Sequence, residues 1–493
     1  MKKFYATTAI DYVNAEPHIG HAYQKVIADV LARWHKILGE EVFFLTGTDE
    51  HGQKIARSAE ATGLSPKEFA DKMAEKFQEA WKKLNVQHDK FIRTTDPSHE
   101  KLVQKFIQEI RKDIYKGTYE GLYCVGCEAY ITEKELVNGF CPYHPDKKPE
   151  VLKEETYFFK LSKFEKPLLD FYKKNPQYIL PKKRANEITN RVKEGLKDLS
   201  ISRTNFTWGI PYPGDNSHVV YVWFDALLNY ITALDWPNGQ NFKKFWPADI
   251  ELLGVDNSWF HCVIWPSMLM SAGIKPAKTI FVHGFLTFNG QKMSKSLGNV
   301  ISPSFLAEKY GADSIRYFIC RNFVFGEDGD FDEKNLAARH NNELANELGN
   351  LLNRTLTLLE KDFQGKIPKS QTSKELQKSL NLKKIKQCME SFELHNALNE
   401  VFAFINACNK FVNDRQPWKQ SGKELEETLY SVADSLRIVS ILLSPFIPET
   451  SEKINAQLGV QTGKIQDCKF NLLKAGTQAK KGEVLFKKID LQN

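Results

Sequence analysis

The alternation of strands and helices in the first 115 residues constrains the fold of this chain most. Strand-like segments at 3–10 and 41–49 enclose a long amphipathic helix over 23–39, and charged helical segments follow from Ser65. Strands that alternate with helices predict a parallel sheet with helical crossovers. Because ligands of such sheets bind beyond the carboxyl ends of the strands, we expect a site in the loops that follow these two strands.

The pattern changes along the rest of the chain. Short strands and turns occupy residues 116–213, strand–helix alternation returns over 214–336, and helical periods alone fill 337–493. A chain of 493 residues exceeds the ~250 to 300 that one core supports. We therefore expect an α/β protein: a doubly wound, Rossmann-like catalytic domain in two halves (1–115 and 214–336), an insertion between them, and a C-terminal all-α helical bundle.

The composition is that of an ordinary globular protein, with 42% apolar and 26% charged residues. The formal charge of +7 gives weak support to a polyanionic partner. No segment approaches the ~18 consecutive apolar residues of a membrane span. Asp11 interrupts the first apolar stretch, so the start of the chain resembles a strand and not a signal peptide. We expect a cytoplasmic protein that does not bind membranes.

Two short motifs follow predicted strands. His18-Ile-Gly-His21 precedes the long helix, and Lys292-Met-Ser-Lys295-Ser follows the strand-like segment near 280–288. Taken alone, the first motif could be helix-start chemistry and the second a solvated lysine turn. A helix start also offers free N–H groups to anions, and two lysines on a loop can stabilise a polyphosphate as its charge shifts. Both motifs therefore suit a phosphate ligand.

Three of the eight cysteines lie close together, whereas the other five are scattered. The cluster reads Cys124-x-x-Cys127 followed by Cys141-x-x-His144. Two such pairs predict tetrahedral zinc, and four protein ligands leave no position for water, so the ion would be structural. The alternative is a set of buried cysteines without a metal.

The two strand-end motifs together resemble the paired signatures of the class I aminoacyl-tRNA synthetases. The stretches "TTAIDYVNAEPHIGH", "FLTGTDEHG", "YVWFDALLNY" and "GVDNSWFHCVIWPSML" closely resemble the methionine-specific members, over essentially the whole chain. The resemblance implies ATP-dependent attachment of methionine to tRNA(Met) through a methionyl-adenylate, with Mg²⁺ accompanying ATP. The catalytic residues that it implies are His18, His21, Lys292 and Lys295.

The resemblance also implies the substrate contacts. A thioether side chain needs an apolar, aromatic-walled slot, and an ammonium group needs a carboxylate. The residues implied for methionine are Ile10, Tyr12, Asp49 (for the ammonium group), His51, Trp223, Ala226, Leu227, Tyr230, Phe260 and His261. Those implied for ATP, besides the four catalytic residues, are Gly20, Gly254, Asp256 and Ser294. Many relatives carry lysine before that aspartate, whereas this chain has Val255.

In the helical domain, three residues resemble the anticodon-reading surface of this family. Asn350 and Arg354 can form paired hydrogen bonds with unstacked bases, and Trp418 offers a stacking face. The alternatives are a solvated helix face and a helix end. No further tRNA-binding or dimerising module follows "LFKKIDLQN", so we expect a monomer.

Two other functions stay open at this point. Valine, isoleucine and leucine enzymes share both signatures but carry a large editing insertion, whereas the segment 116–213 is short; cysteine enzymes place zinc in the substrate pocket. A catalytically dead tRNA-binding protein could keep the fold, but both histidines and both lysines of the motifs are present. Methionine-dependent exchange of pyrophosphate into ATP would distinguish these cases.

Overall fold

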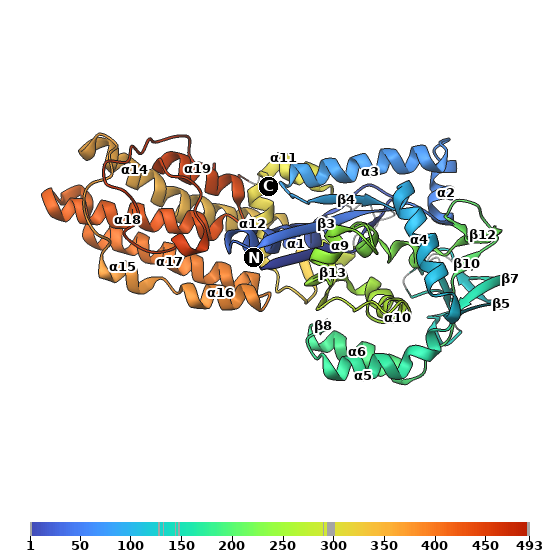
Figure 1. The fold of residues 1–493 in the computed structure, drawn as a ribbon. Coiled ribbons are helices and arrows are strands. Elements are labelled where there is room, and N and C mark those ends of the chain that lie inside the picture. The colour runs from blue at the N-terminus through green and yellow to red at the C-terminus, as the bar shows by residue number, and fades with distance from the viewer. Residues whose placement is uncertain are drawn as a thin grey trace.

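Three parts follow one another along an elongated molecule (Figure 1): a helical bundle at one end, a parallel sheet in the middle and an insertion at the other end. This is a computed structural model. The residues that it describes are 2–126, 129–131, 133–142, 144–145, 148–288, 290–292 and 301–490.

The central sheet is parallel throughout, as the strand–helix alternation predicts, and runs in the order β4-β3-β1-β13-β14-β8. From β1 the chain moves outward to β3 and β4 and later returns on the other side of β1 as β13, so β1 and β13 flank a topological switch point. The strands are β1 (Lys3–Thr8), its continuation β2 (Asp11–Tyr12), β3 (Glu41–Asp49), β4 (Lys90–Arg93), β8 (Ile179–Leu180), β13 (Ile250–Gly254) and β14 (Ile280–His283).

Helices cover both faces of this sheet. Helix α1 (Ile19–Ile37) connects β2 to β3, and because Ala22, Val26 and Val30 are all buried, it is an internal helix and not a surface one. The other helices of the first half are α2 (Gln53–Glu60), α3 (Pro66–Lys83) and α4 (Pro97–Glu109). Those of the second half are α7 (Val222–Ala226), α8 (Asn229–Thr232), α9 (Gln240–Phe245), a π-helix (Phe260–Ile264) and α10 (Trp265–Ser271).

The insertion contains small antiparallel sheets. One has the order β6-β5-β7-β9, with β5 (Ile114–Cys124), β6 (Ala129–Ile131), β7 (Glu150–Phe159) and β9 (Leu199–Ser200). The second has the order β10-β12-β11, with β10 (Ser202–Arg203), β11 (Pro211–Tyr212) and β12 (Asp215–Val220). Helices α5 (Glu165–Lys174) and α6 (Lys182–Lys193) lie in the chain between β7 and β9 of the first sheet. Strand β8, from within 116–213, forms the edge of the central sheet, so this segment is tied to the core; the domain boundaries stay predictions.

A small sheet and three helices lead from the central sheet to the bundle. The strands are β15 (Leu286–Phe288), β16 (Gln291–Lys292) and β17 (Gly329–Phe331), and the helices are α11 (Pro303–Tyr310), α12 (Ala312–Asn322) and α13 (Glu333–Arg339). The predicted helical domain is confirmed. Its helices are a π-helix (His340–Gly349), α14 (Asn350–Phe363), α15 (Lys374–Ser379), α16 (Leu382–Glu390), α17 (Leu394–Arg415), α18 (Gly422–Leu443) and α19 (Pro448–Leu458). Among the described residues, none of the helices has the length and apolarity to cross a bilayer.

The bundle and the central sheet share one apolar core, a continuous set of buried side chains from Phe4 in β1 to Leu458 in α19. Arg316 of α12, which is fully buried, marks the junction. Its guanidinium lies 2.6 Å from the Asp29 carboxylate of α1 and donates to the carbonyl oxygens of Pro445 and Phe446 at 2.8 and 2.9 Å. The bundle is thus connected to the helix that begins with the first motif.

Candidate active site

The first motif forms the start of α1. His18 is the N-cap, and its Nδ1 accepts from the Gly20 amide at 3.1 Å, while His21 Nδ1 accepts from the His18 amide at 3.2 Å. This is the reciprocal arrangement of a capping box, made here by two histidines whose rings lie 3.8 Å apart. Helix-start chemistry is therefore real, and it also fixes both rings at the strand end.

The two bonds determine which nitrogen carries the proton. Burial lowers the pKa of His18 to about 2 and the pKa of His21 to about 3, so both rings are neutral at pH 7. Because each Nδ1 accepts a backbone N–H, the proton is on each Nε2. Two neutral N–H donors therefore accompany the free backbone amides of the helix start, where an anion is favoured.

A large cavity opens at the switch point between β1 and β13, with a volume of about 1640 Å³. His18, Gly20 and His21 line it from α1, while Gly254 and Asp256 line it from the loop after β13. The structure therefore brings these five residues predicted for ATP into one cavity, although the motifs that contain them lie more than 200 residues apart in sequence.

An aromatic wall closes one side of the same cavity. Trp223 and Phe260 stack with ring centroids 3.9 Å apart and planes 4° from parallel. Tyr230 donates its hydroxyl to His261 Nε2 at 2.7 Å, because His261 Nδ1 donates to the Asn257 carbonyl at 2.9 Å. The other predicted methionine residues that line the cavity are Ile10, Tyr12, Asp49, Ala226 and Leu227.

His51 is the predicted methionine residue that does not line this cavity. It is buried, and its Nδ1 lies 2.7 Å from the Asp225 carboxylate, whose other oxygen lies 2.7 Å from His99 Nε2. Burial lowers the pKa of His51, but Asp225 outweighs that effect and the net pKa is raised. Since Asp225 lies in α7 between Trp223 and Ala226, the two histidines hold the short helix that carries part of the aromatic wall.

Sequence reasoning missed two buried cations: Arg203, which lines the cavity, and Lys25, which pairs with a residue of the cavity wall. Arg203 is buried there, with its guanidinium 4.4 Å from the ring centre of Tyr221. Lys25, also fully buried, donates to Asp11 at 2.7 Å beneath the first motif. An arginine or lysine in a sequence usually indicates a solvated surface, so neither residue carried a signal of its own.

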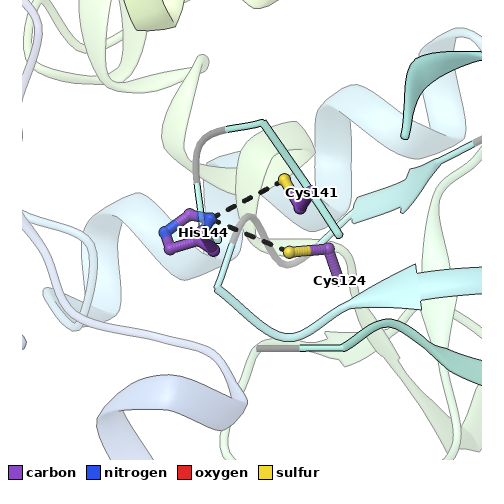
Figure 2. Close-up of side chains that lie close together, drawn as sticks. All are labelled: Cys124, Cys141 and His144. Atoms are coloured by element: carbon purple, nitrogen blue, oxygen red, sulfur yellow. Dashed lines mark hydrogen bonds between the residues drawn. The ribbon is translucent and has the colours of Figure 1, made fainter. Parts of the chain in front are cut away.

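Cys124, Cys141 and His144 converge in the insertion, as Figure 2 shows. His144 Nδ1 lies 3.7 Å from Cys124 Sγ and 3.9 Å from Cys141 Sγ. Sulfur and nitrogen ligands of tetrahedral zinc are about 3.6 Å apart, so these ligand atoms could hold a metal ion. A Cβ on Gly126 would lie 2.4 Å from the His144 ring, so glycine is needed for this approach. The fourth predicted ligand, Cys127, lies outside the described residues.

The second motif is described only at its first residue. Lys292 ends β16, which pairs with β15, but its side chain and Ser294 and Lys295 lie outside the described part of the chain. The neighbouring loop residues Gly284 and Phe285 line the cavity. The positions of the two lysines relative to the cavity stay predictions.

The bundle brings two of the three predicted anticodon residues together. The Arg354 guanidinium lies 5.7 Å from the ring centre of Trp418 and donates to Asn413 at 3.0 Å. Trp418 is 49% exposed, and Asn350 lies one turn before Arg354 on α14. An exposed indole beside a guanidinium and amide groups offers both stacking and hydrogen bonding to bases.

Comparisons with known protein families assign both parts of the chain. The family described as tRNA synthetases class I (M) matches residues 4–148 and 144–356, and the anticodon binding domain of methionyl tRNA ligase matches residues 365–493. The chain belongs to the class I methionyl-tRNA synthetases. The residues that line the cavity fall within the first match, and most of the bundle falls within the second.

Individual members of the methionyl-tRNA synthetase family are similar over the full chain. The methionine–tRNA ligase of Caldanaerobacter subterraneus subsp. tengcongensis is 46% identical over 100% of this chain and 80% of that protein. That of Thermotoga maritima is 43% identical over 100% and 81%. A solved Mycobacterium tuberculosis methionyl-tRNA synthetase in complex with methionyl-adenylate has a TM-score of 0.95 and 38% identity, covering 99% of this chain and 100% of that one.

Proposed function

We propose that this methionyl-tRNA synthetase joins methionine to tRNA(Met) in two steps, at the expense of ATP, through a methionyl-adenylate. The observation that carries the proposal is the single cavity at the β1–β13 switch point. It combines a helix start with two neutral imidazole donors, a Gly254–Asp256 loop and an aromatic wall. The similarity of the whole chain to a synthetase solved with methionyl-adenylate supports the same reaction.

In the first step, the methionine carboxylate attacks the α-phosphorus of ATP and pyrophosphate leaves. The Nε2–H groups of His18 and His21 stabilise negative charge on the phosphates as it develops. Lys292 and Lys295 stabilise the negative charge of the departing pyrophosphate, and Mg²⁺ binds together with ATP. Asp49 accepts the substrate ammonium group, while the stacked Trp223 and Phe260 form the apolar slot for the thioether.

In the second step, the 2′-hydroxyl of the terminal adenosine of tRNA attacks the activated carbonyl, and AMP leaves. No side chain needs to form a covalent bond, so positioning of the reactants supplies most of the rate. The bundle recognises the anticodon through Asn350, Arg354 and Trp418.

The Cys/His cluster holds one structural zinc ion in this proposal. Cys124, Cys127, Cys141 and His144 would be its ligands, and the ion would keep the end of the insertion folded. The ligand-atom spacing and the close approach at Gly126 support this assignment.

We further propose that the chain works in the cytoplasm as a monomer. Its catalytic domain comprises residues 1–115 and 214–336, its insertion 116–213, and its helical anticodon-binding domain 337–493. The lack of a membrane-spanning helix among the described residues fits this location. Size-exclusion chromatography with light scattering tests the monomer; a stable dimer at micromolar concentration contradicts it.

Methionine-dependent exchange of labelled pyrophosphate into ATP tests the reaction, followed by aminoacylation of tRNA(Met). We expect exchange that needs methionine, and a loss of about 10²- to 10³-fold in rate for Lys295→Ala, because its charge acts on the leaving group. Exchange with isoleucine or valine would indicate another class I synthetase. Binding of tRNA without any exchange would indicate a catalytically dead tRNA-binding protein.

A further inference from the structure

His283 lies in the cavity wall and has no role in the mechanism above. It ends β14, and its register partner on β13 is Gly254, so the two residues are side by side at the carboxyl edge of the sheet. The side chain is 92% buried, since its relative exposure is 8%, and it lines the cavity. This is the edge where parallel sheets bind their ligands.

The hydrogen bonding of His283 fixes its chemistry. Nδ1 lies 2.8 Å from the Gly284 carbonyl oxygen, which can only accept, so Nδ1 carries the proton. Burial lowers the pKa of the ring to about 4, so the ring is neutral at pH 7. Nε2 is therefore an acceptor, and it has no hydrogen-bond partner among the described residues. Buried polar atoms without partners are rare and need an explanation.

Neighbouring rings fix the direction of this nitrogen. Tyr23 packs edge-on against the imidazole with centroids 5.1 Å apart, and the Phe325 ring lies 6.4 Å away with its plane tilted by 28°. Gly254 places no side chain beside Nε2: a Cβ at that position would lie 3.8 Å from Nε2 and 2.7 Å from Asp256 Oδ1. Two acceptors of different residues therefore flank one glycine.

We propose that His283 Nε2 accepts a hydrogen bond from a ribose hydroxyl of ATP, beside Asp256; this inference rests on the proposed function. A ribose 2′,3′-diol presents two O–H donors on adjacent carbons, which suits two acceptors around a residue without a side chain. The neutral tautomer cannot donate from Nε2, so this position disfavours groups that only accept, such as phosphate oxygens. His283 is thus assigned to the sugar and not to the phosphates.

Two substitutions separate the acceptor from the shape of the side chain. His283→Met keeps an apolar chain of similar length but no good acceptor, whereas His283→Gln offers an amide oxygen near the position of Nε2. The readout is kcat/KM for ATP, 2′-deoxy-ATP, 3′-deoxy-ATP and inosine triphosphate in methionine-dependent exchange. We expect His283→Met to lose about 3- to 10-fold with ATP, the range of one neutral hydrogen bond, and His283→Gln to recover most of it.

The loss should disappear with one of the two deoxynucleotides, because the hydroxyl that His283 binds is already absent, and it should persist with the other and with inosine triphosphate. An equal loss with all four nucleotides, or no loss, would overturn the inference and leave His283 a packing residue. A loss that disappears only with inosine triphosphate would assign Nε2 to the base amino group and reject the ribose contact.

Tyr23 provides the control for an internal partner. Its buried hydroxyl also lacks a partner among the described residues, so a water could bridge it to Nε2. We expect Tyr23→Phe to match wild type on all four nucleotides; a loss equal to that of His283→Met would overturn the ribose contact. Wild-type protein without methionine-dependent exchange would reject the proposed function itself, a result distinct from all of these.

Discussion

Two histidines of the cavity wall, His261 and His283, are buried and neutral at pH 7. Burial lowers the pKa of both His261 and His283 to about 4, against about 6.5 in an unfolded chain. The unfolded chain therefore binds protons between pH 6.5 and 4 that the native protein does not bind. By linkage, each histidine makes the native state less stable as the pH falls through this window.

The first prediction concerns this pH dependence. Between pH 7.5 and 5.5, each of the two histidines should remove about 1 kcal/mol from the free energy of unfolding. Urea denaturation followed by circular dichroism at both pH values measures it. The His283→Met variant should lose about 1 kcal/mol less than wild type over the same interval, and an identical loss in both proteins would contradict the assignment.

The residue scale also shows where sequence reasoning reached its limit. Trp223 and Phe260 were predicted from the resemblance, and the structure brings them together. His51 lies in the same matched stretch as Asp49 but points to Asp225, beneath the cavity. A sequence motif gives the position of a residue in the chain but does not give the direction of its side chain. Arg203 was missed because its guanidinium packs near the rings of Tyr123 and Tyr221, which belong to other segments of the chain.

At the scale of elements, the insertion depends on its Cys/His cluster. In the second prediction, Cys141→Ser lowers bound zinc below one ion per chain and increases protease sensitivity near 124–144, because metal binding and folding of such clusters are coupled. Metal analysis and limited proteolysis measure both effects. Cys468→Ser is the matched control, since Cys468 is buried outside the cluster and should leave the zinc content unchanged. Wild-type protein without zinc would refute the site.

The third prediction concerns the turn after α17. Trp418→Ala should lower aminoacylation efficiency for tRNA(Met) about 5- to 150-fold, the range for loss of one base stacked on an aromatic ring, and leave pyrophosphate exchange near wild type. Trp418→Phe keeps a stacking face and should recover most of the efficiency. Parallel loss of exchange and aminoacylation would show that Trp418 supports the fold; no change in either would remove it from the tRNA surface.

Elements were predictable in proportion to their length. The long helices and the strands β1 and β3 follow from hydrophobic periodicity over many residues. Two-residue strands such as β8 and β9 contain too few residues for any pattern, and they form because a neighbouring strand is already in place. The sequence therefore separated 116–213 from the sheet, although β8 pairs with β14.

At the scale of the whole molecule, the apolar core is continuous between the sheet and the bundle. The fourth prediction is that both unfold together: tryptophan fluorescence and far-ultraviolet circular dichroism should report the same urea midpoint. Arg316→Met should lower both midpoints, since removing one partner of a buried ion pair costs about 3–5 kcal/mol. Two separate transitions in wild-type protein would contradict a shared core.

The Arg316 junction also limits how this enzyme can be recombined. Its guanidinium contacts Asp29 in α1 and two carbonyl groups of the turn just before α19, so Arg316 joins two stretches that are far apart in sequence. A chimera that receives the bundle of a relative inherits the foreign 445–446 turn and the native α12 together. Such hybrids should stay soluble only when the crossover keeps α12 and that turn from the same parent. The helical bundle of this protein therefore cannot be exchanged alone for that of a relative, even though its sequence matches a separate domain family.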